Sequence, residues 1–538
     1  MSTHTLTLVD VRRVQRYLFN ANELKQNLGA SALVEKATHE WVIEALPKST
    51  NLIWDEDTFK HRFIEGDHFD AEVIFMGGGN VAILFVSHQL AKDFVRTFTK
   101  KLLAEAPGLD VAIGHQDDVD IDTPGSLKAA WDELGEKVMP SRKEGYAKPQ
   151  PILGLGVTAE CAFTSLPAVE EMPDEDAPER GLLVSAEVRA KRGKNAVEYA
   201  KKRLNTLMPA EGDYAYPANF DDLGGEKGRA RYIAVVHADG NGIGNRIRQH
   251  TGSDDHHEMI DAMRSFSEKI NIVGQAAMQS VCDWLRITHQ VDYKGRYYLP
   301  DRWLENEAVW FAGNHLPIRP IVFGGDDITF VCDGRLGLAL AKKFLQEFSQ
   351  TILSDGERGY ACAGVAIVHS HYPFARAYAL AEELARDAKR QAREMDAEAR
   401  VSLLNWHYES AGLTLDWDDI RKRNYTSQKE GDLLLRPLVV ERHPDVPIDA
   451  WRTWDAFTQQ LKYFREDDYR PKLEDLKTTM RKGKPAVRKF TADHWKLPMM
   501  PGLKGEDAEM SGWYQGRCVY FDALEANDLL IYPAEDGK

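Results

Sequence analysis

The chain contains the same order of segments twice, and this repeat constrains the fold more than any other feature. In each copy an apolar strand leads into helices, a glycine-tipped hairpin follows, and a further helix and strand complete the segment. The first hairpin tip reads Gly77-Gly78-Gly79-Asn80 and the second reads Gly324-Gly325-Asp326-Asp327. Glycines supply the positive φ angles that tight hairpin turns need. The repeat therefore predicts two copies of one α+β module.

The repeat also sets the expected domain boundaries. A first module spans residues 1–165 and a second spans 229–400, with a linker that carries a basic helix at 166–228. From 401 to 538 the pattern is mainly helical. We therefore predict an α+β fold with two tandem modules and a helical C-terminal domain.

Charge limits the classes of partner. Among 538 residues, 84 acidic side chains outnumber 68 basic ones, which gives a net charge of -16 and excludes a protein that coats polyanions over its whole surface. RNA contact is expected, if anywhere, at the basic segments 189–203 and 470–489. Charge runs are more often solvated faces. The sequence shows no long apolar run and no secretory signal, which predicts a cytoplasmic protein without a membrane partner.

The cysteines indicate neither a disulfide framework nor a zinc site. There are five, Cys161, Cys282, Cys332, Cys362 and Cys518, and none forms a C-x-x-C pair. We expect reduced, mostly buried thiols.

The chemistry is expected at the second hairpin. Adjacent carboxylates at a hairpin tip, Asp326 and Asp327, are hard oxygen ligands of the kind that Mg²⁺ or Mn²⁺ prefers. Asp239 ends a strand just before a glycine-rich turn and is the expected third carboxylate. The free backbone amides of Gly240 to Gly244 could hold a triphosphate, and Gly240, Asn241 and Gly242 are the expected nucleotide-binding residues. Each motif alone is most simply a turn, but their joint occurrence favours a metal and nucleotide site.

These motifs resemble the catalytic palm of the CRISPR type III effector large subunit, the polymerase/cyclase subunit of the Csm and Cmr complexes, which is related to GGDEF diguanylate cyclases. The resemblance lies in the acidic hairpin, in the strand that ends at Asp239 and in residues 362–393. Residues 8–37 are similar to the opening of the family's first palm. The resemblance implies two tandem ferredoxin-like palm domains over about residues 5–400.

The resemblance also implies an activity. In this family the two palms face each other, hold two ATP molecules and make cyclic oligoadenylate. Carried onto this sequence, Asp239, Asp326 and Asp327 would bind two metal ions. Gly324 and Gly325 would let the backbone approach the nucleotide.

Lys389 is a candidate phosphate contact, although it could equally lie on a solvated helix face.

The first module lacks the acidic tip. A neutral tip cannot hold two divalent ions, so we predict a degenerate first palm. Gly78 and Gly79 can still lie against a nucleotide. Asp10 corresponds to Asp239 and is expected to be structural or to contact the acceptor nucleotide.

Three departures from the family bear on function. We expect no histidine-aspartate nuclease domain ahead of the first palm, and no structural zinc because Cys161 stands alone. The chain is also shorter than usual, which leaves docking on a guide-RNA complex open. The expected partner is ATP, and further candidates are subunits of a guide-RNA complex, target RNA and other copies of the chain.

Two alternatives remain open. The chain could make another cyclic or linear nucleotide messenger outside a guide-RNA complex, or it could be a non-catalytic nucleotide-binding scaffold.

Overall fold

The computed structural model of the chain describes most of its 538 residues. The described residues are 3–52, 63–64, 68–145, 157–174, 179–210, 212–223, 231–409, 416–427, 431–466, 470–504, 507–527 and 529–533. Parts of the acidic linker and of the glycine-rich loop at 221–228 lie outside them.

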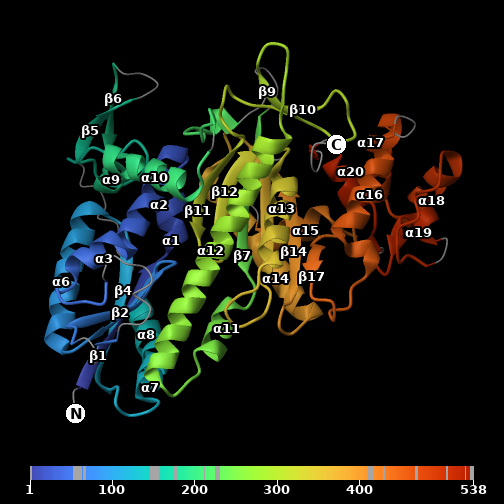
Figure 1. Ribbon diagram of the computed structural model, residues 1–538. Coiled ribbons are helices and arrows are strands. Elements are labelled where there is room, and N and C mark those ends of the chain that lie inside the picture. Colours follow the sequence, from blue (N-terminus) through green and yellow to red (C-terminus); the bar gives the residue numbers. More distant parts are fainter. Residues whose placement is uncertain are drawn as a thin grey trace. The chain divides into compact units, whose positions relative to one another are not determined.

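The chain divides into two compact units, each assembled from segments that are distant in sequence. Unit 1 comprises Met1–Pro209, Ile243–Ile272 and Leu353–Glu357, and unit 2 comprises Ala210–Gly242, Val273–Ile352 and Arg358–Lys538. Figure 1 shows the elements, coloured along the sequence.

Unit 1 is built on a four-stranded antiparallel sheet in the order β2-β3-β1-β4. Its helices include α6, whose first turn is capped by Ser87 Oγ accepting from Leu90 N at 3.4 Å. The strands and helices are β1 (Thr3–Arg12), α1 (Val14–Phe19), α2 (Leu24–Thr38), α3 (Glu40–Ala45), β2 (Ala71–Gly77), β3 (Asn80–Phe85), α6 (His88–Glu105), β4 (Asp110–Asp120), α7 (Ser126–Glu133), the π-helical turn Leu134–Val138, α8 (Met139–Gly145), β5 (Glu170–Pro173), β6 (Gly181–Val184), α9 (Ala186–Arg192), α10 (Lys194–Leu207), α11 (Ile243–His250) and the first half of α12 (His256–Thr288).

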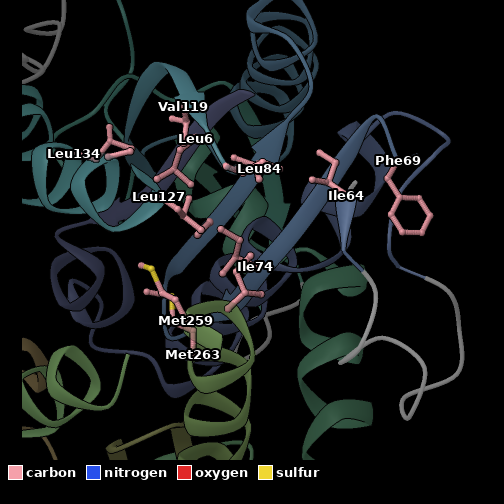
Figure 2. Close-up of a cluster of buried hydrophobic side chains, with 14 residues drawn as sticks. Leu6, Ile64, Phe69, Ile74, Leu84, Val119, Leu127, Leu134, Met259 and Met263 are labelled. Carbon is pink, nitrogen blue, oxygen red and sulfur yellow. The ribbon is translucent and has the colours of Figure 1, made fainter. Parts of the chain in front are cut away.

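One hydrophobic cluster of unit 1 lies on the face of this sheet that α12 covers. Figure 2 shows apolar side chains of the strands, such as Leu6, Ile74 and Leu84, directed toward Met259 and Met263 of α12. All five are buried. Burial of an apolar side chain of this size stabilises a fold by about 1.5–3 kcal/mol. The same face therefore holds α12 against the sheet.

Unit 2 is built on a six-stranded sheet in the order β11-β12-β7-β13-β14-β17. Its strands and helices are β7 (Tyr232–Gly240), the rest of α12, β8 (Gln290–Val291), β9 (Tyr297–Pro300), β10 (Ala308–Trp310), β11 (Ile318–Gly324), β12 (Asp327–Asp333), α13 (Gly337–Gln350), β13 (Ala361–His369), α14 (Phe374–Met395), β14 (Val401–Tyr408), α15 (Trp417–Asn424), β15 (Thr426–Ser427), β16 (Gly431–Asp432), β17 (Leu438–Arg442), α16 (Trp454–Phe464), α17 (Leu473–Arg481), α18 (Lys484–Asp493), α19 (Asp507–Ser511), β18 (Trp513–Tyr514), β19 (Arg517–Cys518) and α20 (Phe521–Ala526).

The two sheets confirm the repeat that the sequence predicts. The order β2-β3-β1-β4 in unit 1 corresponds strand for strand to β11-β12-β7-β13 in unit 2. Even the irregularities agree, since both hairpins carry a register shift in their first strand, at Val73/Phe75 and at Pro320/Val322. The predicted α+β class with two palm-type sheets is therefore confirmed.

The boundary of the C-terminal region differs from the expectation. β14 pairs in parallel with β13, and β17 pairs with β14, so Val401–Tyr408 and Leu438–Arg442 extend the palm sheet. The succession of helices begins at Trp454, the first residue of α16. The strand at 401–408 is buried on both faces, and polar Ser402, Asn405 and His407 interrupt its apolar residues, so its sequence lacks the two-residue alternation of a half-buried strand.

The structure also tests the predictions about the cysteines and about membrane-spanning helices. All five cysteines are buried and unpaired, as predicted. No helix within the described ranges is both long and apolar enough to cross a membrane.

Candidate active site

The acidic hairpin of unit 2 has a two-residue turn. Gly324 pairs with Asp327, and Gly325 and Asp326 form the turn between β11 and β12. Gly325 has a φ of 72°, in the left-handed region that strains other residues. A side chain at Gly324 would meet nothing within 4 Å, so this position lies beside open space.

The strand that ends at Asp239 lies next to this hairpin. β7 pairs antiparallel with β12, with Ala238 opposite Ile328. The ladder runs on past this pair, because Gly240 N donates to Asp326 O at 3.2 Å. One step along the same register, Asp239 is opposite Asp327, and residues opposite each other in an antiparallel pair share a face. The structure therefore places Asp239 beside the hairpin that carries Asp326 and Asp327.

Their proximity changes their acidity. The pKa values of Asp326 and Asp327 are each raised to about 7, first by shielding from water and then by the negative charge of Asp239. The carboxyl group of Glu382, on α14, also raises the pKa of Asp327. Such a cluster of carboxylates favours a bound cation, which removes the repulsion between them.

A cationic side chain already lies in the cluster. Lys389 Nζ is 2.5 Å from Asp239 Oδ2 and donates to Gly240 O at 2.7 Å. The structure thus places Lys389 at the site, as the sequence suggests, but on a carboxylate. Its predicted contact with a phosphate stays a prediction.

The donor chemistry of the site fits divalent magnesium or manganese. Asp327 Oδ1 is buried, accepts no hydrogen bond and lies 3.5 Å from His237 Nδ1. Within the described parts of the chain, no three His, Cys, Asp or Glu side chains are gathered closely enough to hold a metal ion as they stand. Binding therefore requires the carboxylates to turn toward a common point and Asp239 to release Lys389.

The prediction that the turn after Asp239 offers free amides is wrong for two residues. Gly240 N donates to Asp326 O, and Asn241 N donates to Tyr360 O at 2.7 Å. The Asn241 side chain is buried, and its Nδ2 donates to Ala399 O and Val401 O at 3.1 and 2.8 Å. Asn241 therefore fixes the loop after α14. Gly242, with a φ of 68°, is half-buried.

Two glycines that sequence reasoning missed position the site. A Cβ on Gly274 of α12 would lie 2.1 Å from Gly325 O, so the helix backbone touches the turn between β11 and β12. A Cβ on Gly364 of β13 would lie 2.0 Å from Ala381 O, so α14 approaches the sheet closely and carries Lys389 with it. A glycine inside a long helical pattern is the signal that could have identified Gly274.

The first palm repeats the arrangement without the two carboxylates of the hairpin tip. Gly77 pairs with Asn80, and the turn residues Gly78 and Gly79 have φ angles of 59° and 84°. Asp10 is opposite Asn80, which is the register of Asp239 and Asp327 in the second palm. Lys143 of α8 forms an ion pair with Asp10, as Lys389 does with Asp239.

The first basic segment serves the fold of unit 1. Lys191 is buried and donates to Tyr17 O and to Glu187 Oε1, both at 2.6 Å. Arg192 is buried as well and pairs with Glu23 at 2.7 Å. These two cations are not available to RNA.

In the second basic segment, residues 470–489, two of the basic side chains form ion pairs with carboxylates. Lys477 pairs with Glu474 at 2.9 Å, and Arg488 pairs with Asp507 at 2.6 Å. RNA contact at either segment stays a prediction.

Fold and site together define a tandem-palm protein in which the second palm carries the acidic hairpin. The family model for the Cas10/Cmr2 second palm domain matches residues 232–397, from the start of β7 to the end of α14. The resemblance to the CRISPR type III large subunit is thereby confirmed for this domain. No curated protein matches the chain.

Solved structures extend the likeness of fold to nearly the whole chain. A chain of the Csm1-Csm4 cassette in complex with AMPPNP is 14% identical, with 98% of this chain and 69% of that chain covered and a TM-score of 0.53. The cassette in complex with one ATP gives 13% identity, coverage of 99% and 70%, and a TM-score of 0.53. The Csm1-Csm4 subcomplex of the type III-A CRISPR-Csm interference complex gives 14% identity, coverage of 98% and 70%, and a TM-score of 0.51.

The chain is shorter than these relatives. It spans 69–70% of the three matched chains and 63% of another from the same cassette. At 13–14% identity, the likeness shows a common fold.

Proposed function

We propose that this protein is a metal-dependent nucleotidyltransferase that makes cyclic oligoadenylate from ATP in CRISPR type III-like antiviral defence. The observation that carries the proposal is the set of three carboxylates, Asp239, Asp326 and Asp327, at one end of the β7–β12 ladder. A protein that only binds a partner has no need to hold these groups together against their mutual repulsion.

The similar structures support ATP as the substrate. The matched Csm1-Csm4 structures are described as complexes with one ATP, with pppApA, with pppApApA and with cA3. These names describe the similar proteins. Together with the Cas10/Cmr2 palm match they favour the same substrate and product class here.

The residues have separate tasks in the proposed reaction. Asp239, Asp326 and Asp327 would hold two Mg²⁺ or Mn²⁺ ions, which supply positive charge to the triphosphate and to the attacking oxygen when bound. The 3′-hydroxyl oxygen of one ATP forms a bond to the α-phosphorus of the next, the bond to the β-phosphate breaks, and pyrophosphate leaves. Lys389, released from Asp239, would contact a phosphate.

The glycines allow the nucleotides to approach the backbone. Gly324, beside open space, and Gly325, in the turn, would lie against one nucleotide together with Gly242. Gly240 and Asn241 would act by shaping this loop, since their amides are already bonded. In the first palm, Gly78 and Gly79 would lie against a nucleotide without binding a metal.

The proposed setting is the cytoplasm, where the chain would bind a Csm4-like subunit and, through it, a guide-RNA complex that senses target RNA. The named partner of the similar structures is Csm4. A product other than cyclic oligoadenylate would keep the chemistry and change the messenger.

The test is identification of products by mass spectrometry. The purified chain is incubated with Mn²⁺ and each of ATP, GTP, CTP and UTP, with and without RNA and a Csm4-like subunit. We expect adenylate products from ATP alone, and none from an Asp326→Ala/Asp327→Ala variant. Metal-dependent ATP binding without any product, in the presence of the partner and RNA, would contradict the proposal and favour a scaffold.

A further inference from the structure

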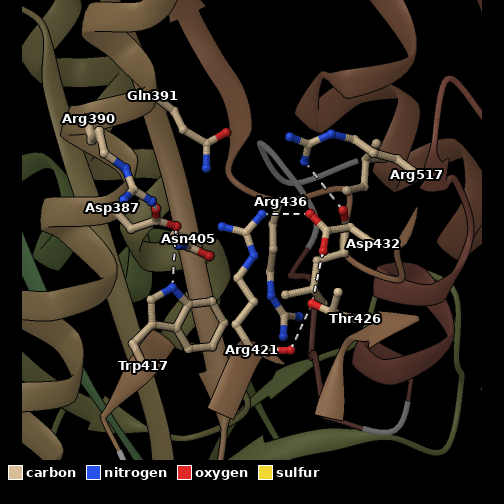
Figure 3. A network of polar contacts seen from close by, with 12 residues as sticks. Asp387, Arg390, Gln391, Asn405, Trp417, Arg421, Thr426, Asp432, Arg436 and Arg517 are labelled. Atoms are coloured by element: carbon tan, nitrogen blue, oxygen red, sulfur yellow. Dashed lines mark hydrogen bonds and ion pairs between the residues drawn. The ribbon is translucent and has the colours of Figure 1, made fainter. Parts of the chain in front are cut away.

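A polar network in unit 2 contains five arginine side chains around the end of α14. They are Arg390, Arg421, Arg436, Arg452 and Arg517. Figure 3 shows four of them, with Gln391 and Asp432. Three of the arginines bind carboxylates, and these pairs are Arg390 with Asp387, Arg421 with Asp432 at 2.6 Å and Arg436 with Glu525 at 2.6 Å.

The other two arginines have no such partner. Among the residues that the structure describes, no carboxylate forms an ion pair with Arg452 or Arg517. Arg452 Nη2 donates to Gln391 Oε1 at 3.2 Å, and its buried Nε makes no hydrogen bond. Arg517 Nη1 makes only a long hydrogen bond, at 3.5 Å, to Leu434 O.

These two guanidinium groups are close enough to affect each other. Trp451 precedes Arg452, and Tyr514 pairs with Arg517 between β18 and β19; the rings of Trp451 and Tyr514 are 5.4 Å apart. Burial and then the positive charge of Arg517 lower the pKa of Arg452 to about 10. Burial, the largest cause, also lowers the pKa of Arg517. Two half-buried charges of the same sign are costly unless an anion lies between them.

The carboxylates nearest to Arg517 do not supply that anion. Asp432 and Asp387 influence Arg517 but are bonded to Arg421 and Arg390. Asp522 is buried and accepts from the backbone amides of Leu435 and Arg436, at 2.9 and 2.7 Å.

Asp449 influences Arg452, but the two form no ion pair. The network therefore leaves two positive charges without a bound counter-charge.

We propose that Arg452, Arg517 and Gln391 form a binding site for a phosphate group. Guanidinium groups bind phosphate oxygens through paired N–H donors. Gln391 Oε1 already accepts from Arg452, so its Nε2 is left as a further donor. Donors from three side chains match the oxygens of a phosphate better than the two oxygens of a carboxylate.

The site is separate from the candidate active site. Gln391 follows Lys389 by two residues on α14, which places the two side chains on roughly opposite faces of the helix. Lys389 contacts Asp239, whereas Gln391 contacts Arg452. The phosphate could belong to a free small anion or to an RNA backbone.

Calorimetry with inorganic phosphate tests the proposal on the full chain, with EDTA present so that the carboxylate site does not contribute. We expect saturable binding with a dissociation constant in the range of about 0.1–10 mM. An Arg452→Gln/Arg517→Gln variant should bind at least about tenfold more weakly, a loss of about 1.4 kcal/mol. Gln391→Ala, which keeps both charges, should weaken binding by about threefold.

The matched control is Arg376→Gln/Arg488→Gln, which changes the net charge equally at two exposed positions. It should bind phosphate as the natural chain does. Circular dichroism checks that all variants are folded. Equal phosphate affinity in the natural chain and the double variant, or no saturable binding, would overturn the proposal.

Competition identifies the source of the phosphate. A single-stranded RNA of about a dozen nucleotides that displaces phosphate from the natural chain indicates an RNA backbone. Displacement by pyrophosphate and not by RNA indicates a small anion. Both outcomes support a phosphate site at Arg452 and Arg517, and neither depends on the nucleotidyltransferase activity.

Discussion

Lys389 Nζ lies 2.5 Å from Asp239 Oδ2, one of the three carboxylates that we propose to bind metal. The same relationship exists in the first palm, where Lys143 pairs with Asp10. In each palm the lysine follows the last strand of the shared four-stranded core and reaches back to the first. The lysine therefore acts as a counter-charge for the aspartate while no metal is bound.

This pairing predicts competition between Lys389 and the metal. A Lys389→Met variant should bind Mn²⁺ more tightly than the natural chain, by roughly threefold to tenfold, because Asp239 is no longer neutralised. The same variant should bind ATP more weakly, since a phosphate contact is lost. Titration of Mn²⁺ by electron paramagnetic resonance measures the first effect. Weaker Mn²⁺ binding in the variant would show that Lys389 does not occupy the metal position.

The contact between Gly274 of α12 and the turn at Gly325 gives a second prediction. Gly274→Ala would place a methyl group 2.1 Å from Gly325 O, so the turn must move. We expect nucleotidyl transfer to fall by about tenfold or more, because displacements of about 1 Å are costly at a reacting centre. Gly135→Ala is the matched control, because a Cβ there meets nothing within 4 Å. Equal rates in both variants would exclude a positioning role for Gly274.

The sequence predicted that the strand ending at Asp239 lies beside the acidic hairpin, because the signals for both elements are local. The two glycine-tipped hairpins and the strand that ends at Asp239 each occupy a few adjacent residues, and the repeat related them to one another. In the structure, the register of β7 and β12 places Asp239 opposite Asp327. The position of Asp10 opposite Asn80 followed in the same way.

Features that depend on contacts between distant segments were missed. Asn241 was expected to contact a nucleotide, but its amide is bonded to carbonyls about 160 residues further along the chain. The approach of Gly274 to Gly325, and the addition of β14 and β17 to the palm sheet, likewise depend on packing. No periodicity within a single segment reports such contacts.

The turn of the first palm gives a prediction on stability. Gly79 has a φ of 84°, so Gly79→Ala should lower the free energy of unfolding by about 1 kcal/mol. Gly324 has no positive φ and open space around it, so Gly324→Ala should change stability by less than about 0.5 kcal/mol. Urea denaturation followed by circular dichroism compares the two. A larger loss of unfolding free energy for Gly324→Ala than for Gly79→Ala would contradict the explanation by the positive φ of Gly79.

The buried charges around Arg436 give a prediction on the C-terminal region. Arg436 is 2% exposed and pairs with Glu525 at 2.6 Å and with Asp522 at 3.3 Å. Arg436→Met should destabilise the fold by about 3–5 kcal/mol, because two carboxyl groups lose their buried partner. Adding Asp522→Asn and Glu525→Gln should recover part of this loss. No recovery in thermal melting would show that packing, rather than charge, dominates at this position.

The most direct test of the central claim is the rate of pyrophosphate release from ATP in four matched proteins, assayed with Mn²⁺ and the partner and RNA conditions that support turnover. These are the natural chain, Asp239→Asn, Asp326→Asn/Asp327→Asn, and Asp10→Asn as the equivalent change in the first palm. The account predicts losses of at least about a thousandfold for the two second-palm variants and less than about tenfold for Asp10→Asn. Comparable rates in all four proteins would contradict a carboxylate-bound metal site at the second palm.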